Sequence, residues 1–252
     1  MSDNKQVYST VEFEDWAYKK LLIYEEKDLI ENYLDPSGKT LEAGTGGGRI
    51  LLEMKKIGFT SLYGYDYVPD LIEEAKQKDP SGNICFEVQD ATSLNYGDND
   101  FAQIVYLQQI ICFIEDTEAR LKALKEAYRI LNKGGTALFS FLSFDARNSS
   151  AMYSIFLRYL GMLRNLRGSP RTIQYLPWLK HGGKINWSAF FDGEPYVYWY
   201  KLEEIDRFLR EVNFEIVAVG SDRQIRKGKM HRSIETLIKE PIAGMLYFVC
   251  KK

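Results

Sequence analysis

The fold of this chain is decided by the stretch Leu41-Glu42-Ala43-Gly44-Thr45-Gly46-Gly47-Gly48-Arg49-Ile50. It follows a short apolar run that predicts a strand, and it leads into a pattern that predicts a helix. Glycine has no Cβ, so at Gly44 and Gly46 the backbone can adopt a positive φ and approach a ligand closely. The first N–H groups of the following helix have no partner inside the helix and can point at that ligand. The stretch therefore predicts a ligand-binding turn, with a plain turn as the alternative.

The spacing of the glycines argues against a dinucleotide as the ligand. A dinucleotide-binding loop reads G-x-G-x-x-G, and its third glycine lets helix and strand pack closely. Arg49 stands at that third position. Glu42 lies just before the glycines, where a carboxylate would repel a pyrophosphate but would attract an amine. We therefore expect a ligand that presents an amine, and a nicotinamide-dependent (NAD) oxidoreductase is the nearest alternative enzyme.

Length and composition favour one α/β domain with an insertion. The chain has 252 residues, of which 45% are apolar, enough to bury one substantial core. A net charge of −2 and a pI near 5.9 disfavour broad binding to nucleic acid or to an anionic membrane, although they leave local basic patches open. The polar first residues have no signal-peptide pattern, and no apolar run approaches the roughly 20 residues that cross a bilayer. A cytoplasmic location is therefore expected.

The three cysteines, Cys85, Cys112 and Cys250, are odd in number and have no C-x-x-C spacing. This pattern argues against a disulfide framework and against a thiolate zinc site. Two of them lie in apolar runs, where cysteine is usually a small buried hydrophobic residue. We predict no metal site.

Strand and helix patterns alternate through much of the chain. Apolar residues recur at helical spacing before a turn at 35–38. Strands are then expected at 39–43, 61–66, 84–88, 101–108 and 136–142, and helices at 49–57, 69–78 and 117–131, the last capped by Thr117. Such alternation winds into a parallel sheet with helices on both faces. A helix at 201–212 and strands at 214–219 and 245–250 follow, the strands most simply as an antiparallel pair at the sheet edge.

The alternation breaks between residues 144 and 200. A connection of roughly fifty residues is far longer than usual between elements, which suggests a functional lid. It contains a helical stretch at 152–166 that is apolar almost all round, and aromatic tracts at 175–179 and 196–200. Tyrosine and tryptophan offer flat apolar surface, so we predict that the insertion closes over the ligand and forms a pocket for an organic molecule. A second small core is the alternative role for these aromatic residues.

Polar residues stand at the ends of three predicted strands. Asp66, Asp90 and Gln108 each end a strand, and the carboxyl ends of parallel strands line the binding crevice of such sheets. Asp66 follows the glycines by about twenty residues, the separation at which an acidic residue meets ribose hydroxyls in a βαβ unit. Capping of the helix that begins near Pro69 is the alternative for Asp66, and turn formation is the alternative for Asp90. Together the strand ends predict a ligand with a ribose and an amine.

At this point the sequence resembles a known family, the class I S-adenosylmethionine-dependent methyltransferases, over about residues 39–142. The glycine stretch is similar to the family's E/D-x-G-x-G-x-G loop, and three further motifs match: Gly64-Tyr65-Asp66-Tyr67-Val68-Pro69, Gln89-Asp90-Ala91 and Leu131-Asn132-Lys133-Gly134-Gly135. The resemblance implies an α/β fold with a Rossmann-like, mostly parallel seven-stranded sheet, with S-adenosylmethionine (S-adenosyl-L-methionine, SAM) as the cofactor.

The expected organisation is a single domain in four parts. Residues 1–38 form an N-terminal helical cap, 39–143 the cofactor-binding core, 144–200 the lid and acceptor insertion, and 201–252 a C-terminal helix and antiparallel strand pair.

The resemblance also implies roles for individual residues. At the methionyl end of the cofactor, Glu42 anchors the amine, the backbone of Gly44, Thr45 and Gly46 approaches the same group, and Gln108 lines the pocket floor.

In the adenosine half, Asp66 binds the ribose hydroxyls and Tyr67 packs on the adenine. Asp90 accepts from the adenine amino group, with the Ala91 N–H nearby.

Two positions depart from the family pattern. Ala102 follows Phe101 where the family often has an aspartate, and Phe113 stands where many relatives carry a histidine. The second departure disfavours a metal-dependent or histidine-assisted mechanism.

The predicted activity is transfer of a methyl group to an oxygen or nitrogen nucleophile of a small organic acceptor, by in-line displacement. Metabolite, lipid and peptide acceptors stay open, nucleic acid is disfavoured by charge, and a non-catalytic ligand-binding protein is the alternative outside enzymes. His181 and His231 are the only histidines, and a surface or packing role is expected of each. No catalytic residue is predicted.

Two further hypotheses concern the surface around the ligand. Tyr8 and Trp16 are candidates to close the cofactor side. The helix at 152–166 could lie on a membrane with Arg158, Arg164 and Arg167 at the head groups, but its all-round apolarity favours a buried lid helix.

Overall fold

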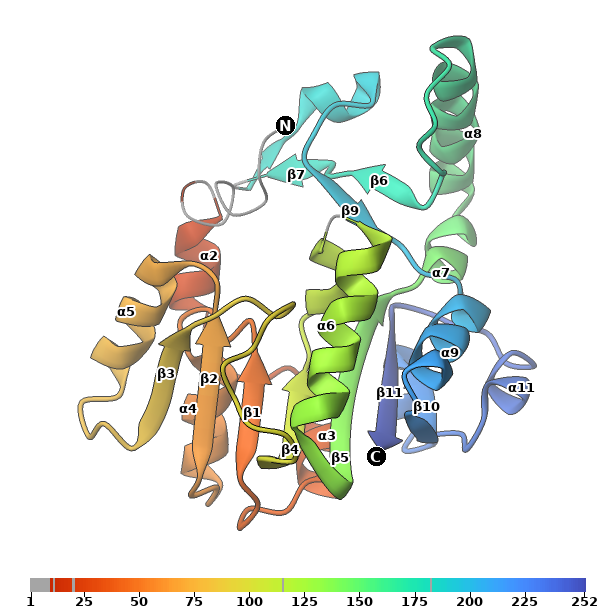
Figure 1. Cartoon of the computed structure of the whole chain (residues 1–252). Helices are drawn as coiled ribbons and strands as arrows, with labels where there is room; N and C mark the ends of the chain where they lie inside the picture. The colour runs from red at the N-terminus through yellow and green to blue at the C-terminus, as the bar shows by residue number, and fades with distance from the viewer. Residues whose placement is uncertain (1–9, 11, 20, 115, 182) are drawn as a thin grey trace.

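The computed structural model describes residues 10, 12–19, 21–114, 116–181 and 183–252 of the chain. At its centre is a seven-stranded sheet with the strand order β10-β11-β5-β4-β1-β2-β3 (Figure 1). In chain order the strands are β1 (Thr40–Ala43), β2 (Leu62–Asp66), β3 (Ile84–Val88), β4 (Phe101–Tyr106), β5 (Leu131–Leu142), β10 (Glu215–Ser221) and β11 (Met245–Lys251). The predicted fold class, an α/β protein with a mostly parallel seven-stranded sheet, is confirmed.

Among the described strands of this sheet, β11 is the one that runs against the others. β1 pairs in parallel with β2 and β4, β2 with β3, and β4 with β5, whereas β11 pairs antiparallel with both β5 and β10. The predicted antiparallel pair is confirmed, with β11 inserted between β5 and β10 so that β10 forms the edge. The chain winds outward from β1 through β2 to β3 and then crosses to β4 on the other side of β1. Such a switch of direction leaves a ligand crevice at the carboxyl ends of the strands.

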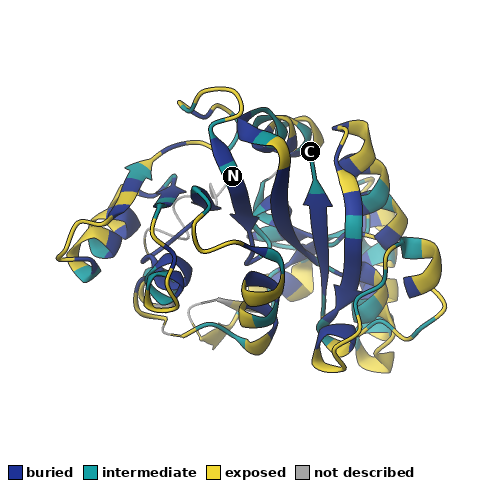
Figure 2. Cartoon of the chain, turned by 90° about the horizontal axis from the view of Figure 1, so that it is seen from below, coloured by how far each residue is buried: buried dark blue, intermediate teal, exposed yellow. Residues whose placement is uncertain are grey.

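Helices cover both faces of the sheet. One apolar face receives α3 (Tyr24–Tyr33), α4 (Arg49–Lys56), α5 (Pro69–Lys78) and α10 (Asp222–Arg226), and the other receives α6 (Thr117–Ile130), α9 (Leu202–Glu211) and α11 (Ile234–Leu237). Figure 2 shows most of the sheet in the dark blue of buried residues, with the yellow of exposed residues on the outer sides of the helices. The near-continuous apolar strands reflect this cover on both sides.

The helix starts follow local chemistry. Pro69 stands in the first turn of α5, where its fixed φ suits a helix. The N-cap of α6 is Asp116, whose carboxylate accepts a hydrogen bond from the Ala119 N–H at 2.8 Å. The predicted cap at Thr117 is therefore wrong by one residue, because a carboxylate satisfies the free N–H groups of a helix start better than a hydroxyl.

The N-terminal segment contributes α2 (Phe13–Tyr18) and α3. A buried ion pair ties α3 to α4: the Arg49 guanidinium donates to the two carboxylate oxygens of Glu26 at 2.5 and 2.7 Å. Arg49 replaces the third glycine of a dinucleotide loop, and its side chain is used to hold two helices together. This contact explains physically why the loop departs from the dinucleotide pattern.

The insertion consists of short elements that stand above the sheet in Figure 1. They are α7 (Phe144–Asn148), α8 (Ala151–Leu166), β6 (Tyr175–Pro177), β7 (Lys180–His181), β8 (Lys184–Ile185), the 3-10 helix η2 (Trp187–Phe191) and β9 (Tyr196–Tyr198). β6 pairs with β9 and β7 with β8, both antiparallel. A buried ion pair between Arg164 and Asp192, at 2.6 Å, joins α8 to the end of η2.

The insertion leaves and rejoins the core at one point. Ser143 and Tyr200 form an isolated parallel bridge. The Phe144 N–H donates to the Tyr200 carbonyl at 2.8 Å, and the Tyr200 N–H donates to the Leu142 carbonyl at 2.9 Å. The two ends of the insertion are thus fixed side by side at the end of β5.

α8 is not the buried lid helix that the sequence predicts. Met152, Ile155, Tyr159, Met162 and Leu166 are between 38% and 79% exposed, whereas Leu157 and Leu160 on the opposite side are buried. The interpretation was wrong because the helix lies at the rim of the insertion and packs on one side only. Of the three arginines assigned to head groups, Arg164 is buried in its ion pair with Asp192. Within the described ranges, no helix combines the length and apolarity that a membrane crossing requires.

Candidate active site

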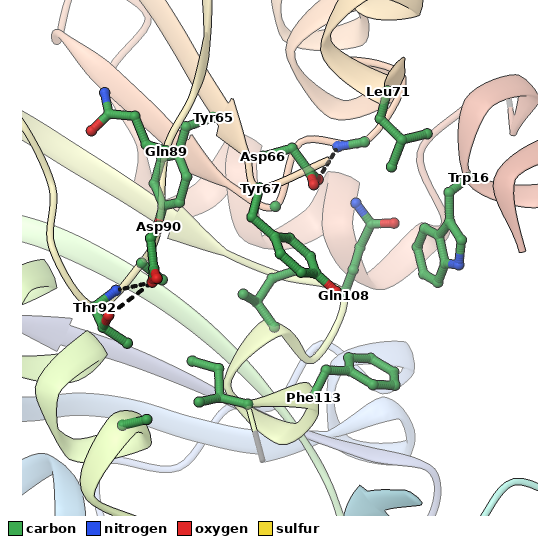
Figure 3. A pocket seen from close by; sticks show the side chains of 16 residues that line it. Trp16, Tyr65, Asp66, Tyr67, Leu71, Gln89, Asp90, Thr92, Gln108 and Phe113 are labelled. Carbon is green, nitrogen blue, oxygen red and sulfur yellow. Dashed lines mark hydrogen bonds between the residues drawn. The ribbon is translucent and has the colours of Figure 1, made fainter. Parts of the chain in front are cut away.

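A cavity of about 380 Å³ lies at the carboxyl ends of β1 to β4 (Figure 3). Its size is within the range of sites for small ligands. Of the residues predicted to bind cofactor, the following line it: Gly44, Gly46, Asp66, Tyr67, Asp90, Ala91 and Gln108. Glu42 and Thr45 are the two predicted residues that do not form its wall. We call this space the first cavity.

Asp66 occupies the end of β2 and is 5% exposed. One carboxylate oxygen accepts from the Gly46 N–H at 2.9 Å and the other from the Val68 N–H at 3.0 Å. Burial raises the pKa of Asp66, and these backbone donors lower it in part. A carboxylate has about four acceptor positions, so Asp66 holds the glycine turn and the entry to α5 and still has capacity for a ligand diol.

Glu42 and Thr45 form a buried pair next to the first cavity. The Thr45 hydroxyl donates to one oxygen of the Glu42 carboxyl at 2.6 Å. The other oxygen is buried and has no hydrogen-bond partner among the described residues. Burial raises the pKa of Glu42 to about 8, against the opposing effects of Thr45 and Arg49. An ammonium group, or a water bridging to one, would satisfy this orphaned oxygen, so the site fits a ligand with an amine.

Asp90 and Ala91 follow β3 and line the first cavity. Figure 3 shows Asp90 at the opposite end of the cavity from Trp16. One Asp90 oxygen accepts from both the N–H and the hydroxyl of Thr92, at 2.8 and 2.9 Å. These bonds form a turn, which is the role that the sequence analysis gave as the alternative to ligand binding for Asp90. The second oxygen makes no hydrogen bond within the described parts of the chain, so Asp90 keeps an acceptor for a ligand.

Gln108 and Gln109 form a strained turn after β4. Both have a left-handed backbone, with φ of 66° and 61°. The Gln109 N–H donates to the Ser140 hydroxyl at 2.9 Å, which holds this conformation on β5. Non-glycine residues in this region cost on the order of 1 kcal/mol or more and cluster at ligand sites. The turn brings the Gln108 amide into the wall of the first cavity, as Figure 3 shows.

Trp16, Leu71, Ile110, Phe113 and Ile114 supply the apolar part of the first cavity. Trp16 was a predicted candidate to close the cofactor side, and the other four were not predicted as wall residues. The run at 110–114 is apolar, and no local pattern indicates that it folds back over the glycine turn. It does so closely, because a Cβ on Gly44 would stand 2.3 Å from the Ile110 side chain. Trp16 reaches the site through a long-range contact, in which its carbonyl accepts from the Gly47 N–H at 3.3 Å.

A second cavity of about 600 Å³ adjoins the first beneath the insertion. It is lined mainly by apolar and aromatic side chains, with three charged ones: Glu12, Trp16, Phe113, Arg147, Met152, Tyr153, Phe156, Pro177, Trp178, Leu179, Lys180, Ile185, Phe190, Val197 and Trp199. Trp16 and Phe113 line both cavities. The Phe113 ring also meets the Trp178 ring edge-on, with 5.5 Å between ring centres, and so connects the core to the insertion.

Among the described side chains, no histidine lines either cavity. His231 pairs through its backbone with Val219, and its Nε2 lies 3.5 Å from the Glu240 carboxylate. It lines neither cavity. The side chain of His181 and the whole of Tyr8 lie outside the described parts of the chain. Among the residues that the structure describes, no group of three or more His, Cys, Asp or Glu is arranged to hold a metal ion.

Comparisons with known proteins agree with this geometry. Residues 41–139 match a family described as a methyltransferase domain. The chain is 32% identical over 103 residues to a ubiquinone/menaquinone biosynthesis C-methyltransferase of Bdellovibrio bacteriovorus, covering 40% of this chain and 42% of that protein. It is 29% identical over 113 residues to a ribosomal protein L11 methyltransferase of Dictyoglomus thermophilum, covering 45% and 35%. The matched part therefore spans less than half the length of these relatives.

The fold extends further than the sequence match. The crystal structure of an S-adenosylmethionine-dependent methyltransferase from Methanosarcina mazei superposes with a TM-score of 0.64, covering 93% of this chain and 99% of that one at 20% identity. Fold and site together define an α/β protein with a ligand-sized cavity at the switch point of its sheet. With the matches above, residues 41–139 are similar to a methyltransferase domain, and the chain as a whole has the fold of the S-adenosylmethionine-dependent methyltransferases.

Proposed function

We propose that this enzyme transfers the methyl group of S-adenosylmethionine, bound in the first cavity, to an oxygen or nitrogen nucleophile of a small organic acceptor in the second. The observation that carries the proposal is that the two cavities adjoin and share Trp16 and Phe113. Methyl transfer needs donor and acceptor in line at near-attack distance. Two adjoining pockets with a common wall supply that arrangement.

The residues of the first cavity would hold the cofactor by complementary groups. Glu42, through its orphaned oxygen, meets the methionyl amine, and the backbone at Gly44 and Gly46 allows close approach. Asp66 accepts from the ribose hydroxyls. When bound, the cofactor supplies an already activated methyl group on its sulfonium, so the protein contributes binding and orientation.

The remaining cofactor contacts are placed at the adenine and at the pocket floor. Tyr67 offers its ring face to the adenine, and Asp90 accepts from the adenine amino group beside the Ala91 N–H. Gln108 orients the methionyl end from the turn after β4. These roles are those that the family resemblance implies, and the gathering of the side chains around one cavity supports them (Figure 3).

The insertion would act as the lid over the acceptor. Its aromatic side chains exclude water and offer flat surface to an organic molecule. The names of the matched relatives state a quinone-pathway C-methylation and a ribosomal protein as their targets. Residues 144–200 lie outside the family match at 41–139, so those targets are not carried over to this acceptor pocket.

Calorimetry tests the cofactor first. We expect S-adenosylmethionine to bind with one site and NADH not to bind. Loss of S-adenosylmethionine binding in Asp66→Ala, with binding kept in the exposed control Asp70→Ala, would assign the site. Tight binding of NADH instead would contradict the proposal.

The acceptor is then found by transfer. The protein is incubated with a cell extract and methyl-labelled S-adenosylmethionine, and mass spectrometry identifies the molecule that gains about 14 Da. We expect one dominant small molecule, absent when Asp66→Ala replaces the wild type. Labelling of no molecule by a protein that binds the cofactor would contradict catalysis and favour a ligand-binding role.

A further inference from the structure

The wall of the second cavity contains a cation that has no counter-ion among the described residues. Arg147, on α7, lies with its guanidinium carbon 3.5 Å from the centre of the Tyr153 ring and 4.6 Å from that of Trp199. Its Nε is buried without a hydrogen-bond partner, and it makes no ion pair among the described residues. Arg147 is half-buried. Of the fully buried arginines, Arg49 and Arg164 each have a carboxylate partner, and Arg120 donates to the Ile114 carbonyl and to the hydroxyls of Thr117 and Tyr175. Arg147 is built into an aromatic wall and lacks the anion that usually accompanies such a group.

The surroundings of Arg147 favour an anion from outside the protein. Partial removal of a cation from water costs free energy when no opposite charge is near, and burial accordingly lowers the pKa of Arg147. The other charged residues of the cavity wall are Glu12 and Lys180, so cations are in excess there. A guanidinium is a planar fork that binds the two oxygens of a carboxylate, phosphate or similar oxyanion at once.

We propose that Arg147 sets the substrate class: the methyl acceptor is an apolar or aromatic molecule that carries an anionic group, and that group binds the Arg147 guanidinium. The ring of the acceptor lies among the aromatic side chains of the cavity, and Tyr153 and Trp199 hold the guanidinium in place. This inference rests on the proposed function, because it takes the second cavity as the acceptor site.

A matched pair of fluorescent probes tests the charge requirement. 8-Anilinonaphthalene-1-sulfonate and N-phenyl-1-naphthylamine have the same ring system and differ in the sulfonate. We expect Arg147→Met to lower the affinity for the sulfonate probe about tenfold or more, since a charged hydrogen-bonded contact is lost. The affinity for the neutral probe should change less than about twofold. Arg147→Lys should restore part of the lost affinity. Arg171→Met is the matched control, because Arg171 also lies 3.5 Å from a ring, that of Tyr196, but outside the cavity wall.

The outcomes separate this inference from the proposed function. Equal weakening of both probes by Arg147→Met would mean that Arg147 only supports the cavity, and no change in either would mean that it does not face a ligand. Either result overturns the inference while calorimetry with S-adenosylmethionine still stands. Absence of S-adenosylmethionine binding to the wild type would instead remove the proposed function.

An independent observation concerns the outer face of the insertion. The exposed residues Met152, Ile155, Tyr159, Met162 and Leu166 recur at spacings of three and four, which places them on one stripe of α8. The stripe continues onto η2, since the Tyr159 hydroxyl donates to the Phe190 carbonyl at 2.8 Å and Trp187 and Phe191 are exposed. Figure 1 shows α8 projecting away from the sheet. We call this surface the α8–η2 face.

The charge of the insertion complements an acidic surface. Residues 144–200 contain seven Lys and Arg against three Asp and Glu, a net charge of +4. The whole chain carries −2, so the remainder carries −6. Arg158 lies exposed on α8, and Arg167 donates to the Phe191 carbonyl at 2.7 Å on the same side as η2. A second copy of the chain would place like charges opposite each other in a two-fold contact, which disfavours a dimer through this face.

We infer that the α8–η2 face binds an anionic lipid surface, with its apolar side chains in the head-group region and its basic side chains at the phosphates. An apolar stripe with tryptophan and phenylalanine beside it and a basic rim is the pattern of interfacial helices. Met152 and Phe190, which line the second cavity, belong to the same elements as this face.

Vesicle flotation with the full chain tests the lipid surface. We expect the protein to float with vesicles of phosphatidylcholine and phosphatidylglycerol, to stay behind with phosphatidylcholine alone, and to be released by high salt. Ile155→Gln with Leu166→Gln should reduce flotation about tenfold or more. The control pair is Ile57→Gln with Ile238→Gln, which are exposed isoleucines elsewhere and should leave flotation unchanged.

Two results would overturn this second inference. One is equal flotation, or none, with both kinds of vesicle. The other is a dimer in analytical ultracentrifugation that dissociates in Ile155→Gln with Leu166→Gln, which would make a second copy of the chain the partner.

Discussion

The first and the second cavity share Trp16 and Phe113 but differ in the side chains and elements that form their walls. In the first cavity, polar side chains come from the ends of neighbouring parallel strands, and each strand is held by hydrogen bonds to the next. In the second, aromatic side chains come from short elements that are held by two small strand pairs, β6 with β9 and β7 with β8, and by side-chain contacts such as the Arg164–Asp192 pair. The cofactor half is fixed by the seven-stranded sheet, whereas the acceptor half is fixed by elements outside that sheet.

This difference suggests how the two halves can vary independently. The insertion begins and ends at the hydrogen-bonded pair Phe144 and Tyr200, so its interior can change without moving a strand of the sheet. The polar ends of β2 and β3 cannot move without disturbing the pairing of the sheet itself. We therefore expect changes in the insertion to alter transfer and changes at the strand ends to alter cofactor binding.

Removal of residues 150–195, replaced by a short glycine and serine linker, tests the separation most strongly. We expect S-adenosylmethionine affinity to change only a few-fold and methyl transfer to fall by about a thousandfold or more, because positioning of the acceptor is lost. Calorimetry measures the first quantity and transfer of the labelled methyl group the second. Circular dichroism checks that the shortened chain folds. Methyl transfer at the wild-type rate would contradict the role of the insertion in positioning the acceptor.

Asp66→Asn tests the strand ends. The amide has only one acceptor oxygen, so one of the two N–H groups now bound by Asp66 loses its partner and the ribose loses a charged acceptor. We expect the Kd for S-adenosylmethionine to rise on the order of fiftyfold, as for the loss of a hydrogen bond to a charged group. Calorimetry is the measurement, and Asp70→Asn on the exposed side of α5 is the control. An unchanged Kd for S-adenosylmethionine would mean that Asp66 does not bind the cofactor.

The pH dependence of binding tests Glu42. Its pKa is about 8 in the folded protein without ligand, so the carboxyl is mainly protonated at neutral pH, and an ammonium ligand requires it to ionise. We expect the affinity for S-adenosylmethionine to rise about tenfold from pH 6 to pH 7. Because Glu42 must ionise, binding of the ligand should release a proton. Calorimetry in buffers of different ionisation enthalpy measures that proton. Glu42→Gln should remove both effects, and a flat profile in the wild type would contradict the assigned role.

The same carboxyl gives a stability test without ligand. A pKa raised on folding from 4.5 to about 8 means that the folded state keeps a proton that the unfolded state releases, so stability declines as pH rises through that window. The wild type should therefore lose thermal stability relative to Glu42→Gln between pH 5 and pH 8. Parallel melting temperatures for the two proteins would argue against the raised pKa.

Asp90→Asn should have the smallest effect. Asp90 is exposed and already bonded to Thr92, so water competes for its contact with the ligand. We expect the Kd for S-adenosylmethionine to rise only about threefold to tenfold, measured by calorimetry. An effect as large as that of Asp66→Asn would show that the two strand ends are more alike than their burial suggests.

Much of the core was predictable because its signals are local. Alternating strands and helices, the proline that opens α5 and the acids at the strand ends are all visible within a few residues of each other. The polar part of the first cavity followed from the rule that parallel strands end at one edge. Apart from the candidate Trp16, the apolar wall did not follow, because residues such as Ile110 reach the glycine turn through contacts that are remote in sequence.

The insertion was harder to predict for a physical reason. An apolar helix such as α8 has the same sequence pattern whether it is buried on all sides or exposed on one, and only its neighbours decide. Arg147 also carried no sign in the sequence, since its lack of a counter-ion depends on which rings surround it. The predicted cap at Thr117 was wrong by one residue because two capping residues stand side by side, and the stronger one, Asp116, precedes it.

The place of β11 in the sheet has a consequence for how the protein assembles. β10 is synthesised before β11, yet among the described strands of the sheet its neighbour is β11, which must first dock along β5. During translation, β10 therefore cannot join the sheet until β11 has emerged from the ribosome. A chain that stops before Met245 would leave the edge of β5 unpaired and prone to aggregation.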